Sequence, residues 1–390
     1  MSSFNLDTLV RPRILSLEPY RCARDDFKEG ILLDANENAY GPSITDLKKE
    51  EQKLELHRYP DPHQLELKQL MVNFRNSENK FPLNDDQLLT TENLCLGVGS
   101  DESIDALIRT ICIPGKDKLL TAPPTYGMYS ICATINDIEI VKVPLDFTTF
   151  QINPEKINDA ITKDPSIKLV YITTPGNPTG TLIDFQLILK ILENPNWNGL
   201  VIADEAYIDF ATIGSSLSTL VNKYPNLIVF QTLSKSFGLA SIRLGFTFAN
   251  KRLSGILNAL KAPYNISTLT SDVAIRALKP DAITLMRANC EILNNERSKL
   301  IKNLSGLKFI NGLIGGEDAN FILIQIANEN DEPDSPRAKF IYEKLANDKG
   351  VVVRYRGNEP GCAGCLRVTI GTIEENKILL NRFQQVVDEL

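Results

Sequence analysis

Histidine is scarce in this sequence. The 390 residues include only His57 and His63, both in the proline-rich stretch 57–63. A mechanism that needs a histidine base, or a metal site built from several histidines, is therefore disfavoured. The pattern Cys362-x-x-Cys365 is half of a zinc-site motif, but no second pair at suitable spacing follows it. We therefore expect no metal site.

Long apolar segments are also missing. No uninterrupted apolar run is long enough to span a bilayer. Residues 1–7 have neither the basic region nor the apolar region of a signal peptide. The seven cysteines are odd in number and scattered, which favours buried thiols in a reducing compartment. These absences predict a cytoplasmic protein without a membrane partner.

Positive charge is in deficit. The chain has 42 Lys and Arg residues against 49 Asp and Glu, which gives a formal net charge of −7. Because nucleic acid is bound through a basic surface, this balance predicts no nucleic-acid partner, although it leaves room for local sites that bind small anions. The apolar share of 43% and the charged share of 23% are ordinary for a well-packed protein, and 390 residues are enough for more than one domain.

The middle of the chain alternates short β-rich runs with amphipathic stretches. Ile104, Leu107, Ile108 and Ile111, for example, recur at helical spacing. Such alternation is typical of the α/β class, in which helices flank a mostly parallel sheet. We expect a large domain with a seven-stranded sheet, with strands at 93–98, 118–122, 139–143, 168–173, 200–204, 226–232 and 244–249.

The pattern changes after about residue 263. A helical region is expected at 268–304, followed by short strands and a last amphipathic helix, which predicts a smaller α+β domain. The short strands are expected at 308–310, 320–326, 351–354 and 366–370. The predicted organisation is an N-terminal arm (1–38) that packs on the small domain or on a partner subunit, a large domain (39–265) and a small domain (266–390).

Four segments place polar residues directly after a predicted strand, namely 97–102, 173–180, 203–207 and 232–243. Because ligands bind at the carboxyl ends of the strands in open α/β sheets, we expect these segments to lie together. Taken alone, each also has a structural interpretation. Residues 97–102 can simply cap a helix, and residues 173–180 can simply form a turn.

Two of these segments contain charged residues suited to chemistry. Asp204 ends an apolar strand, so its carboxylate needs either a structural ion pair or a ligand cation. Lys235 is either a solvated surface residue or, in a partly apolar site, an amine nucleophile with a lowered pKa. Ser234 and Arg243 can supply a hydroxyl and a guanidinium for a phosphate. A carboxylate, a lysine amine and a phosphate cradle are together what pyridoxal phosphate requires.

Motifs in the same segments resemble a known family. The stretches 177–180 (Asn-Pro-Thr-Gly), 204–207 (Asp-Glu-Ala-Tyr) and 234–238 (Ser-Lys-Ser-Phe-Gly) resemble the signature of fold-type-I, class II aminotransferases, which use pyridoxal 5'-phosphate. The resemblance covers about residues 11–390. Five further stretches are similar to the histidinol-phosphate aminotransferase branch of this family, namely 18–24, 58–62, 123–129, 353–354 and 365–371.

This resemblance implies roles for the matching residues. Lys235 would react with the cofactor aldehyde and move the proton, and Asp204 would pair with the ring nitrogen. Tyr207 and Asn177 would hydrogen-bond the ring hydroxyl oxygen. Tyr59 would reach the cofactor of a second subunit, which implies a homodimer. The other implied cofactor contacts are Ser100, Asp101, Glu102, Tyr126, Ser234 and Arg243, and the implied substrate contacts are Tyr20, Asn36, Asn177, Arg354 and Arg367.

The resemblance also implies a reaction. It is the reversible transamination between L-histidinol phosphate and 2-oxoglutarate, which yields imidazole-acetol phosphate and L-glutamate in histidine biosynthesis. Two other functions compete with it. One is a sister enzyme on the same scaffold, either an aminotransferase for aromatic or other amino acids or a decarboxylase of an amino-acid phosphate. The other is a binding protein without catalysis, which the presence of both Lys235 and Asp204 disfavours.

Overall fold

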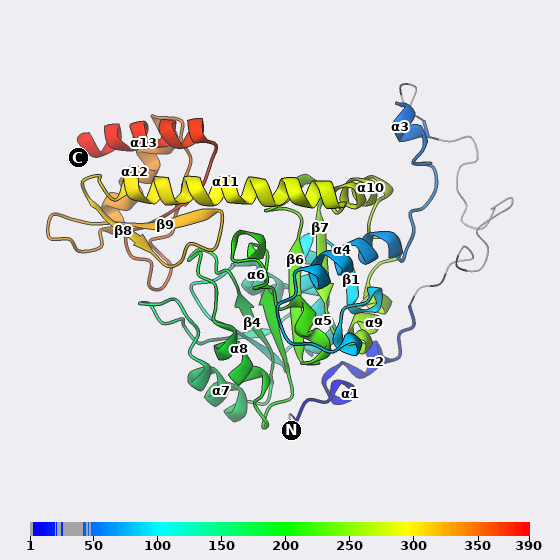
Figure 1. The fold of residues 1–390 in the computed structure, drawn as a ribbon. Coiled ribbons are helices and arrows are strands. Elements are labelled where there is room, and N and C mark those ends of the chain that lie inside the picture. The colour runs from blue at the N-terminus through cyan, green and yellow to red at the C-terminus, as the bar shows by residue number, and fades with distance from the viewer. Residues whose placement is uncertain (1–2, 20, 22–24, 26–41, 44–45, 47) are drawn as a thin grey trace.

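The computed structural model describes residues 3–19, 21, 25, 42–43, 46 and 48–390, which form two β-sheets joined by a long helix (Figure 1). The large sheet contains β1 (Leu94–Val98), β2 (Lys118–Thr121), β3 (Glu139–Lys142), β4 (Ile167–Thr173), β5 (Leu200–Asp204), β6 (Leu227–Thr232) and β7 (Leu244–Phe248). The small sheet contains β8 (Ile310–Ile314), β9 (Phe321–Ile326), β10 (Arg354–Tyr355) and β11 (Cys365–Thr369). The seven strands predicted for the large sheet are confirmed, each end to within one residue.

The large sheet is mostly parallel, as predicted. Its strand order is β1-β7-β6-β5-β4-β2-β3, and β7 is antiparallel to both of its neighbours, β1 and β6. The other six strands therefore run in one direction. The carboxyl ends of β1, β4, β5 and β6 consequently lie along one edge, where ligands bind in folds of this kind.

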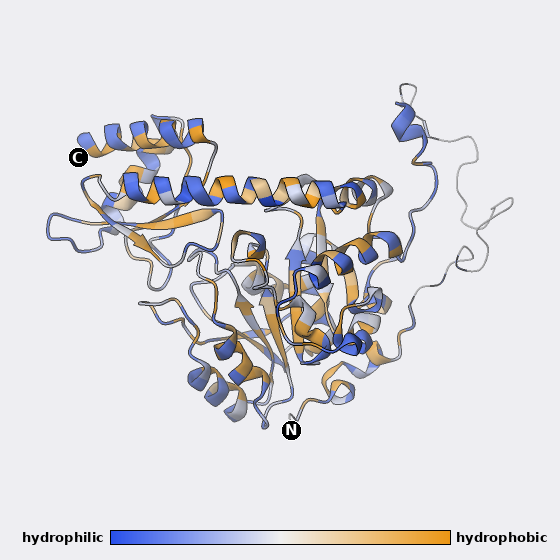
Figure 2. Cartoon of the chain, in the orientation of Figure 1, coloured by the Kyte–Doolittle hydropathy of each residue, from blue (hydrophilic) through white to orange (hydrophobic). Residues whose placement is uncertain are grey.

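Helices cover both faces of the large sheet, because its strands are apolar on both sides. In β4, Leu169 and Tyr171 join one core while Val170 and Ile172 join the other. Figure 2 shows that the covering helices turn their apolar sides toward the sheet. The first core takes α5 (Gly99–Ile111), α6 (Met128–Ile135) and α9 (Lys251–Leu260), and the second takes α4 (Leu65–Ser77), α7 (Pro154–Lys163) and α8 (Phe185–Leu192).

The helical region predicted at 268–304 is two helices instead of one. The helix α10 (Thr268–Ala277) ends just before Pro280, which begins α11 (Pro280–Leu304). Proline has no backbone N–H to donate within a helix and disfavours helical geometry in the residue before it. The chain therefore breaks at this position.

The helix α11 belongs to both cores. Its residues Met286 and Cys290 pack with the large sheet, whereas Leu300 and Leu304 pack with the small one. The domain boundary at 265/266 thus stays a prediction. Across the described part of the chain, no helix is both long and apolar enough to cross a membrane.

Two strands of the small sheet differ from the predicted ranges. The strand β8 runs through the turn-forming pair Asn311-Gly312, where its register with β9 shifts. Residues 351–353 are not a strand, because the Val351 N–H donates instead to the Leu345 carbonyl oxygen at the end of α12 (Ser335–Asn347). The last helix, α13 (Ile373–Asp388), packs Phe383 into the hydrophobic core of the small sheet, as expected.

The described part of the N-terminal arm lies against the large sheet. In α1 (Leu6–Leu9) both terminal leucines are buried in the core that contains α5 and α9. The short helices α2 (Pro12–Leu15) and α3 (Lys49–Gln52) follow along the chain. Most of residues 20–38 lie outside the described residues, so packing of the arm on the small domain and the substrate site stays a prediction.

Two glycines bring β7 and the start of α5 into close contact. A Cβ added to Gly245 would lie 2.5 Å from the carbonyl carbon of Gly99 and 2.7 Å from the backbone nitrogen of Ser100. Gly99 itself has a φ of 73°, a conformation that favours glycine. The missing side chains therefore let the helix N-terminus rest directly on the sheet.

This contact predicts the effect of a methyl group. We expect Gly245→Ala to lower the free energy of unfolding by about 1–3 kcal/mol, because the α5 N-terminus must move away from β7. Gly255→Ala is a matched control, since the added Cβ meets nothing within 4 Å in the middle of α9. It should stabilise the protein by about 0.5–1 kcal/mol. Urea unfolding measures both, and equal effects would contradict the close contact.

Candidate active site

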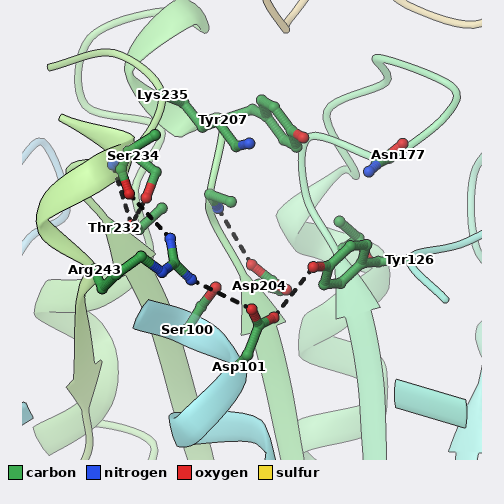
Figure 3. A pocket seen from close by; sticks show the side chains of 13 residues that line it. Ser100, Asp101, Tyr126, Asn177, Asp204, Tyr207, Thr232, Ser234, Lys235 and Arg243 are labelled. Atoms are coloured by element: carbon green, nitrogen blue, oxygen red, sulfur yellow. Dashed lines mark hydrogen bonds and ion pairs between the residues drawn. The ribbon is translucent and has the colours of Figure 1, made fainter. Parts of the chain in front are cut away.

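A pocket opens at the carboxyl edge of the large sheet (Figure 3). All four polar segments that follow the predicted strands contribute to it, so the expectation that they lie together is confirmed. Nine of the predicted site residues line it, namely Ser100, Asp101, Tyr126, Asn177, Asp204, Tyr207, Ser234, Lys235 and Arg243. The remaining lining residues are Thr173, Ala206, Thr232 and Ala240.

Asp204 is a buried carboxylate at the floor of this pocket. It ends β5 and is only 2% exposed. The Tyr129 hydroxyl donates to its Oδ2 at 2.6 Å, and the Ala206 N–H donates to its Oδ1 at 3.3 Å. Burial raises the pKa of Asp204 to about 6, and these hydrogen bonds offset only part of the cost. The residues that hydrogen-bond it are neutral, which leaves a position for a cation in the pocket.

Lys235 faces Asp204 across the pocket. The residue as a whole is exposed, but its amine points into the pocket and lies 5.6 Å from the centre of the Tyr207 ring (Figure 3). Partial burial of this amine lowers the pKa of Lys235, and the positive charges of Arg367 and Arg243 lower it further. Such an amine releases its proton more easily than an exposed lysine does and is suited to nucleophilic and general-base chemistry.

The other end of the pocket is built to bind an anion. Ser100 lies in the first turn of α5, where backbone N–H groups have no acceptor within the helix. The hydroxyl of Ser234 lies 2.8 Å from that of Thr232. Arg243 has a φ of 50°, and its carbonyl oxygen accepts a hydrogen bond of 3.0 Å from the Gly99 N–H. A guanidinium, a hydroxyl and free N–H groups therefore converge.

Asp101 connects the two ends. Its Oδ1 accepts a hydrogen bond of 3.1 Å from the Tyr126 hydroxyl, and its Oδ2 lies 3.5 Å from a guanidinium nitrogen of Arg243. Burial and the charge of Asp101 raise the pKa of Tyr126, so this phenol stays protonated near neutral pH. The ring of Tyr126 is thereby held at the wall of the pocket (Figure 3).

On the side of the small sheet, the pocket is closed by an amide and an arginine. Arg367 of β11 donates a hydrogen bond of 2.6 Å to Oδ1 of Asn177. The guanidinium of Arg367 also lies 5.2 Å from the centre of the Phe321 ring, and this ring packs edge-on against Tyr207. The two sheets therefore meet at the residues that line the site.

Arg367 belongs to a cluster of positive charge that the sequence revealed only in part. Arg354 pairs with Arg367 across β10 and β11, and two like charges opposite each other are unfavourable without an anion. Arg356, two residues further on, was not predicted as a site residue. The guanidinium of Arg356 lies 2.8 Å from the carboxylate of Glu359. Burial is the main cause that lowers the pKa of Arg367, and the positive charge of Arg356 lowers it further. The signal available in the sequence was the spacing Arg354-x-Arg356, although Arg356 lies just beyond the end of β10.

Two residues that were predicted to contact the cofactor lie outside the pocket of this chain. Glu102 does not line the pocket, because its carboxylate accepts hydrogen bonds of 2.5 Å from the Val98 N–H and 3.2 Å from the Asn265 amide. Tyr59 is 52% exposed and stacks on Tyr264 with ring centres 4.7 Å apart. The predicted substrate contacts Tyr20 and Asn36 lie outside the described residues.

Tyr129 is a residue of the site that sequence reasoning missed. It is fully buried and contributes the short hydrogen bond to Asp204, while its ring stacks on Tyr171. It comes three residues after Tyr126 and is the second residue of α6, whereas Tyr126 precedes this helix. The buried pair Cys362 and Cys365 has no metal partner set, since among the described residues no group of three or more His, Cys, Asp or Glu side chains is placed to hold an ion.

The sequence model of aminotransferase class I and II matches residues 28–383, so this chain is an aminotransferase of class I and II. Histidinol-phosphate aminotransferase of Candida maltosa is 54% identical over 390 residues, and that of Saccharomyces cerevisiae is 53% identical over 393, with 99% of this chain and of each relative covered. The chain belongs to the histidinol-phosphate aminotransferase family. The crystal structure of histidinol-phosphate aminotransferase from Sinorhizobium meliloti in complex with pyridoxal-5'-phosphate shares the fold, with a TM-score of 0.74 at 20% identity over 91% of this chain and 90% of that one.

The pocket fits pyridoxal 5'-phosphate, the cofactor of this family. The buried carboxylate of Asp204 lies where it can pair with a protonated ring nitrogen, and the amine of Lys235 can reach an aldehyde beside it. The free N–H groups at the start of α5, together with Ser234 and Arg243, suit a phosphate. The donors thus match the three polar ends of the cofactor.

The burial of Asp204 predicts how the cofactor-free protein responds to pH. Its pKa of about 6 in the folded chain lies above the ordinary value of 3.8. Well below pH 3.8 the carboxyl is protonated in both the folded and the unfolded state, so its burial costs nothing. Between pH 4 and 6 the unfolded chain loses this proton first, so the folded state becomes less stable as pH rises. Above pH 6 the full penalty is present.

We therefore expect Asp204→Asn to raise the free energy of unfolding of the cofactor-free protein by about 2 kcal/mol at pH 7.5 and to change it little below about pH 3.5. Asparagine can still accept the hydrogen bond from Tyr129. Urea unfolding at the two pH values measures the difference. A variant that is less stable than the wild type at pH 7.5 would contradict the burial argument.

Proposed function

We propose that this chain catalyses transamination of L-histidinol phosphate with 2-oxoglutarate, using the pocket at the carboxyl edge of the large sheet. The observation that carries the proposal is that Asp204 and Lys235 line one cavity, while Arg367 donates a hydrogen bond to Asn177, another lining residue. The identity of 53–54% to histidinol-phosphate aminotransferases over the full chain supports this substrate.

Each side chain around the cofactor has a proposed task. Asp204 stabilises a positive charge on the ring nitrogen, and pyridoxal phosphate then supplies an electron sink for the substrate carbanion. Tyr207 and Asn177 hydrogen-bond the ring hydroxyl oxygen. Tyr126 covers one face of the ring. The phosphate is held by Ser100, Asp101, Ser234 and Arg243, with Asp101 acting through its backbone N–H.

Lys235 carries the proton. Its lowered pKa favours the neutral amine, which would react with the aldehyde of pyridoxal phosphate when the cofactor is bound and would accept a proton from the substrate carbon. The neighbouring phenol of Tyr207 is held protonated, because burial raises its pKa although Arg367 opposes the shift. A proton donor, the phenol of Tyr207, and a proton acceptor, the amine of Lys235, therefore line the same pocket.

The arginines of the small sheet bind the substrate anion. We propose that Arg367 and Arg354 hold the phosphate of histidinol phosphate in one half of the reaction and the carboxylate of glutamate in the other. Their opposition across β10 and β11 is relieved when an anion lies between them. Tyr20 and Asn36 complete this proposed substrate site from the N-terminal arm.

The proposed working unit is a homodimer in the cytoplasm. Tyr59 lies outside the pocket of its own chain, where it stacks on Tyr264, and we place it at the cofactor phosphate of the second subunit. Cys95, Cys112, Cys132, Cys290, Cys362 and Cys365 are free thiols in the described part of the chain, which supports a reducing compartment.

Absorbance of the purified holoprotein tests the function. It should be yellow, lose this colour with L-histidinol phosphate and regain it with 2-oxoglutarate. Lys235→Ala should abolish turnover while the urea midpoint stays close to that of the wild type. A yellow protein that responds only to another amino donor would change the substrate and keep the class. A protein that takes up no pyridoxal phosphate would overturn the site.

Arg354→Ala tests the proposed anion site. We expect kcat/KM for L-histidinol phosphate to fall about 10- to 100-fold, because a charge-assisted hydrogen bond to phosphate is lost, and kcat/KM for L-histidinol to fall less than about 3-fold. Lys339→Ala is a charge-matched control on the exposed face of α12 and should change neither value. Equal losses of kcat/KM for the two substrates would contradict the proposed role of Arg354.

A further inference from the structure

Lys235 lies between two serines that are held by different parts of the protein. The Ser234 hydroxyl lies 2.8 Å from that of Thr232, which ends β6. On the other side, the Ser236 hydroxyl donates a hydrogen bond of 2.6 Å to Oδ2 of Asp209. The backbone of Lys235 is thus restrained from both directions.

Asp209 is a rigid acceptor for the second of these hydrogen bonds. It lies in the short 3₁₀ helix Ile208–Phe210 and is 7% exposed. Arg75 of α4 donates to its two carboxylate oxygens at 2.8 and 3.4 Å. Arg287 of α11 donates to its Oδ1 at 3.1 Å and to its carbonyl oxygen at 2.9 Å. Burial opposes the charge of Asp209, but the two arginines outweigh it and keep its pKa below the ordinary value.

The ion pairs of this cluster do not need Ser236. Arg75 also donates to Gln231 at 2.7 Å, and Arg287 binds both carboxylate oxygens of Glu78 at 2.7 and 2.6 Å. The hydroxyl of Ser236 is neutral and does not change the net charge of this cluster. Its hydrogen bond restricts the movement of the loop that carries Lys235.

The acceptor also belongs to the segment that carries the other reacting groups. Asp209 follows Tyr207 by two residues and Asp204 by five. The bond from Ser236 to Asp209 therefore links the segment of Lys235 directly to the segment of Asp204 and Tyr207. A shift in this link changes the distance between the amine and the ring-binding carboxylate.

We propose that Asp209, acting through Ser236, is a positioning residue that holds the amine of Lys235 against the cofactor. Because Arg287 binds the same carboxylate, the helix that carries the small sheet and the lysine loop share one anchor. The inference rests on the role proposed for Lys235. A displacement of about 1 Å in a reacting group can reduce a rate about 100-fold.

Ser236→Ala in the holoenzyme tests the proposal, because it removes the link and leaves the ion pairs in place. We expect kcat with L-histidinol phosphate to fall about 10-fold, while KM changes less than about 2-fold. The pH midpoint of the cofactor's visible absorbance, measured without substrate, should move by at least about 0.3 unit, a 2-fold change in proton affinity. Ser236→Thr keeps a hydroxyl and should restore both values toward those of the wild type.

Ser166→Ala is the matched control. Ser166 also donates to an aspartate, Asp164, which is itself paired with Lys118 at 3.2 Å. This serine precedes β4, at the opposite edge of the large sheet from the pocket. Its loss should leave kcat and the pH midpoint unchanged. Asp209→Asn, where it folds, should show the same shift of the midpoint as Ser236→Ala.

Two results overturn the inference. One is a Ser236→Ala enzyme with the kcat and pH midpoint of the wild type. The other is a loss of kcat that Ser166→Ala shares, since this would reflect general destabilisation. The proposed function fails separately, and the inference with it, if the wild type shows no cofactor absorbance or if Lys235→Ala keeps the wild-type pH dependence of that absorbance.

Discussion

The site depends on one costly placement, the carboxylate of Asp204 at the buried end of β5. The structure gives it neutral hydrogen-bond partners, and its pKa of about 6 records the cost of that burial. A cation on a bound ring relieves this cost, so the binding of pyridoxal phosphate and the chemistry that it supplies draw on the same electrostatic imbalance. The burial of Asp204 therefore lowers the stability of the cofactor-free protein and favours the binding and reactivity of a cationic ring in the pocket.

The fold around the pocket maintains this uncompensated negative charge of Asp204. Parallel strands bring four loops to one edge, and the close contact of Gly245 with Gly99 sets the start of α5 beside Arg243. Positive charge is placed at the phosphate end and at the small sheet, whereas the floor between them is negative. This distribution of charge suits a flat, zwitterionic cofactor in one orientation. The hydrogen bond from Ser236 to Asp209 ties the segment that carries Lys235 to the same framework.

Much of the fold was predictable because its signals are local. Several strands of the large sheet, such as β4 and β5, are apolar on consecutive positions, and the limits of all seven agree with the predicted ones within one residue. The strand β8 was not predictable in this way. It passes through Asn311-Gly312, a pair typical of turns, and is a strand only because β9 pairs with it. Pro280 is visible in the sequence, but the structure shows that it divides the predicted helical region into α10 and α11.

In the site, the sequence alone determined the chemical inventory: the lysine, the aspartate, the serines and the arginine, in segments that follow strands and resemble one aminotransferase family. Only the tertiary structure decided which of these side chains meet. It turned Glu102 away to the Val98 N–H, brought Tyr129 to Asp204 and added Arg356 to the charge cluster. The physical reason is that motifs are local, whereas burial and the electrostatic field at a group are set by residues that are distant along the chain and close in space.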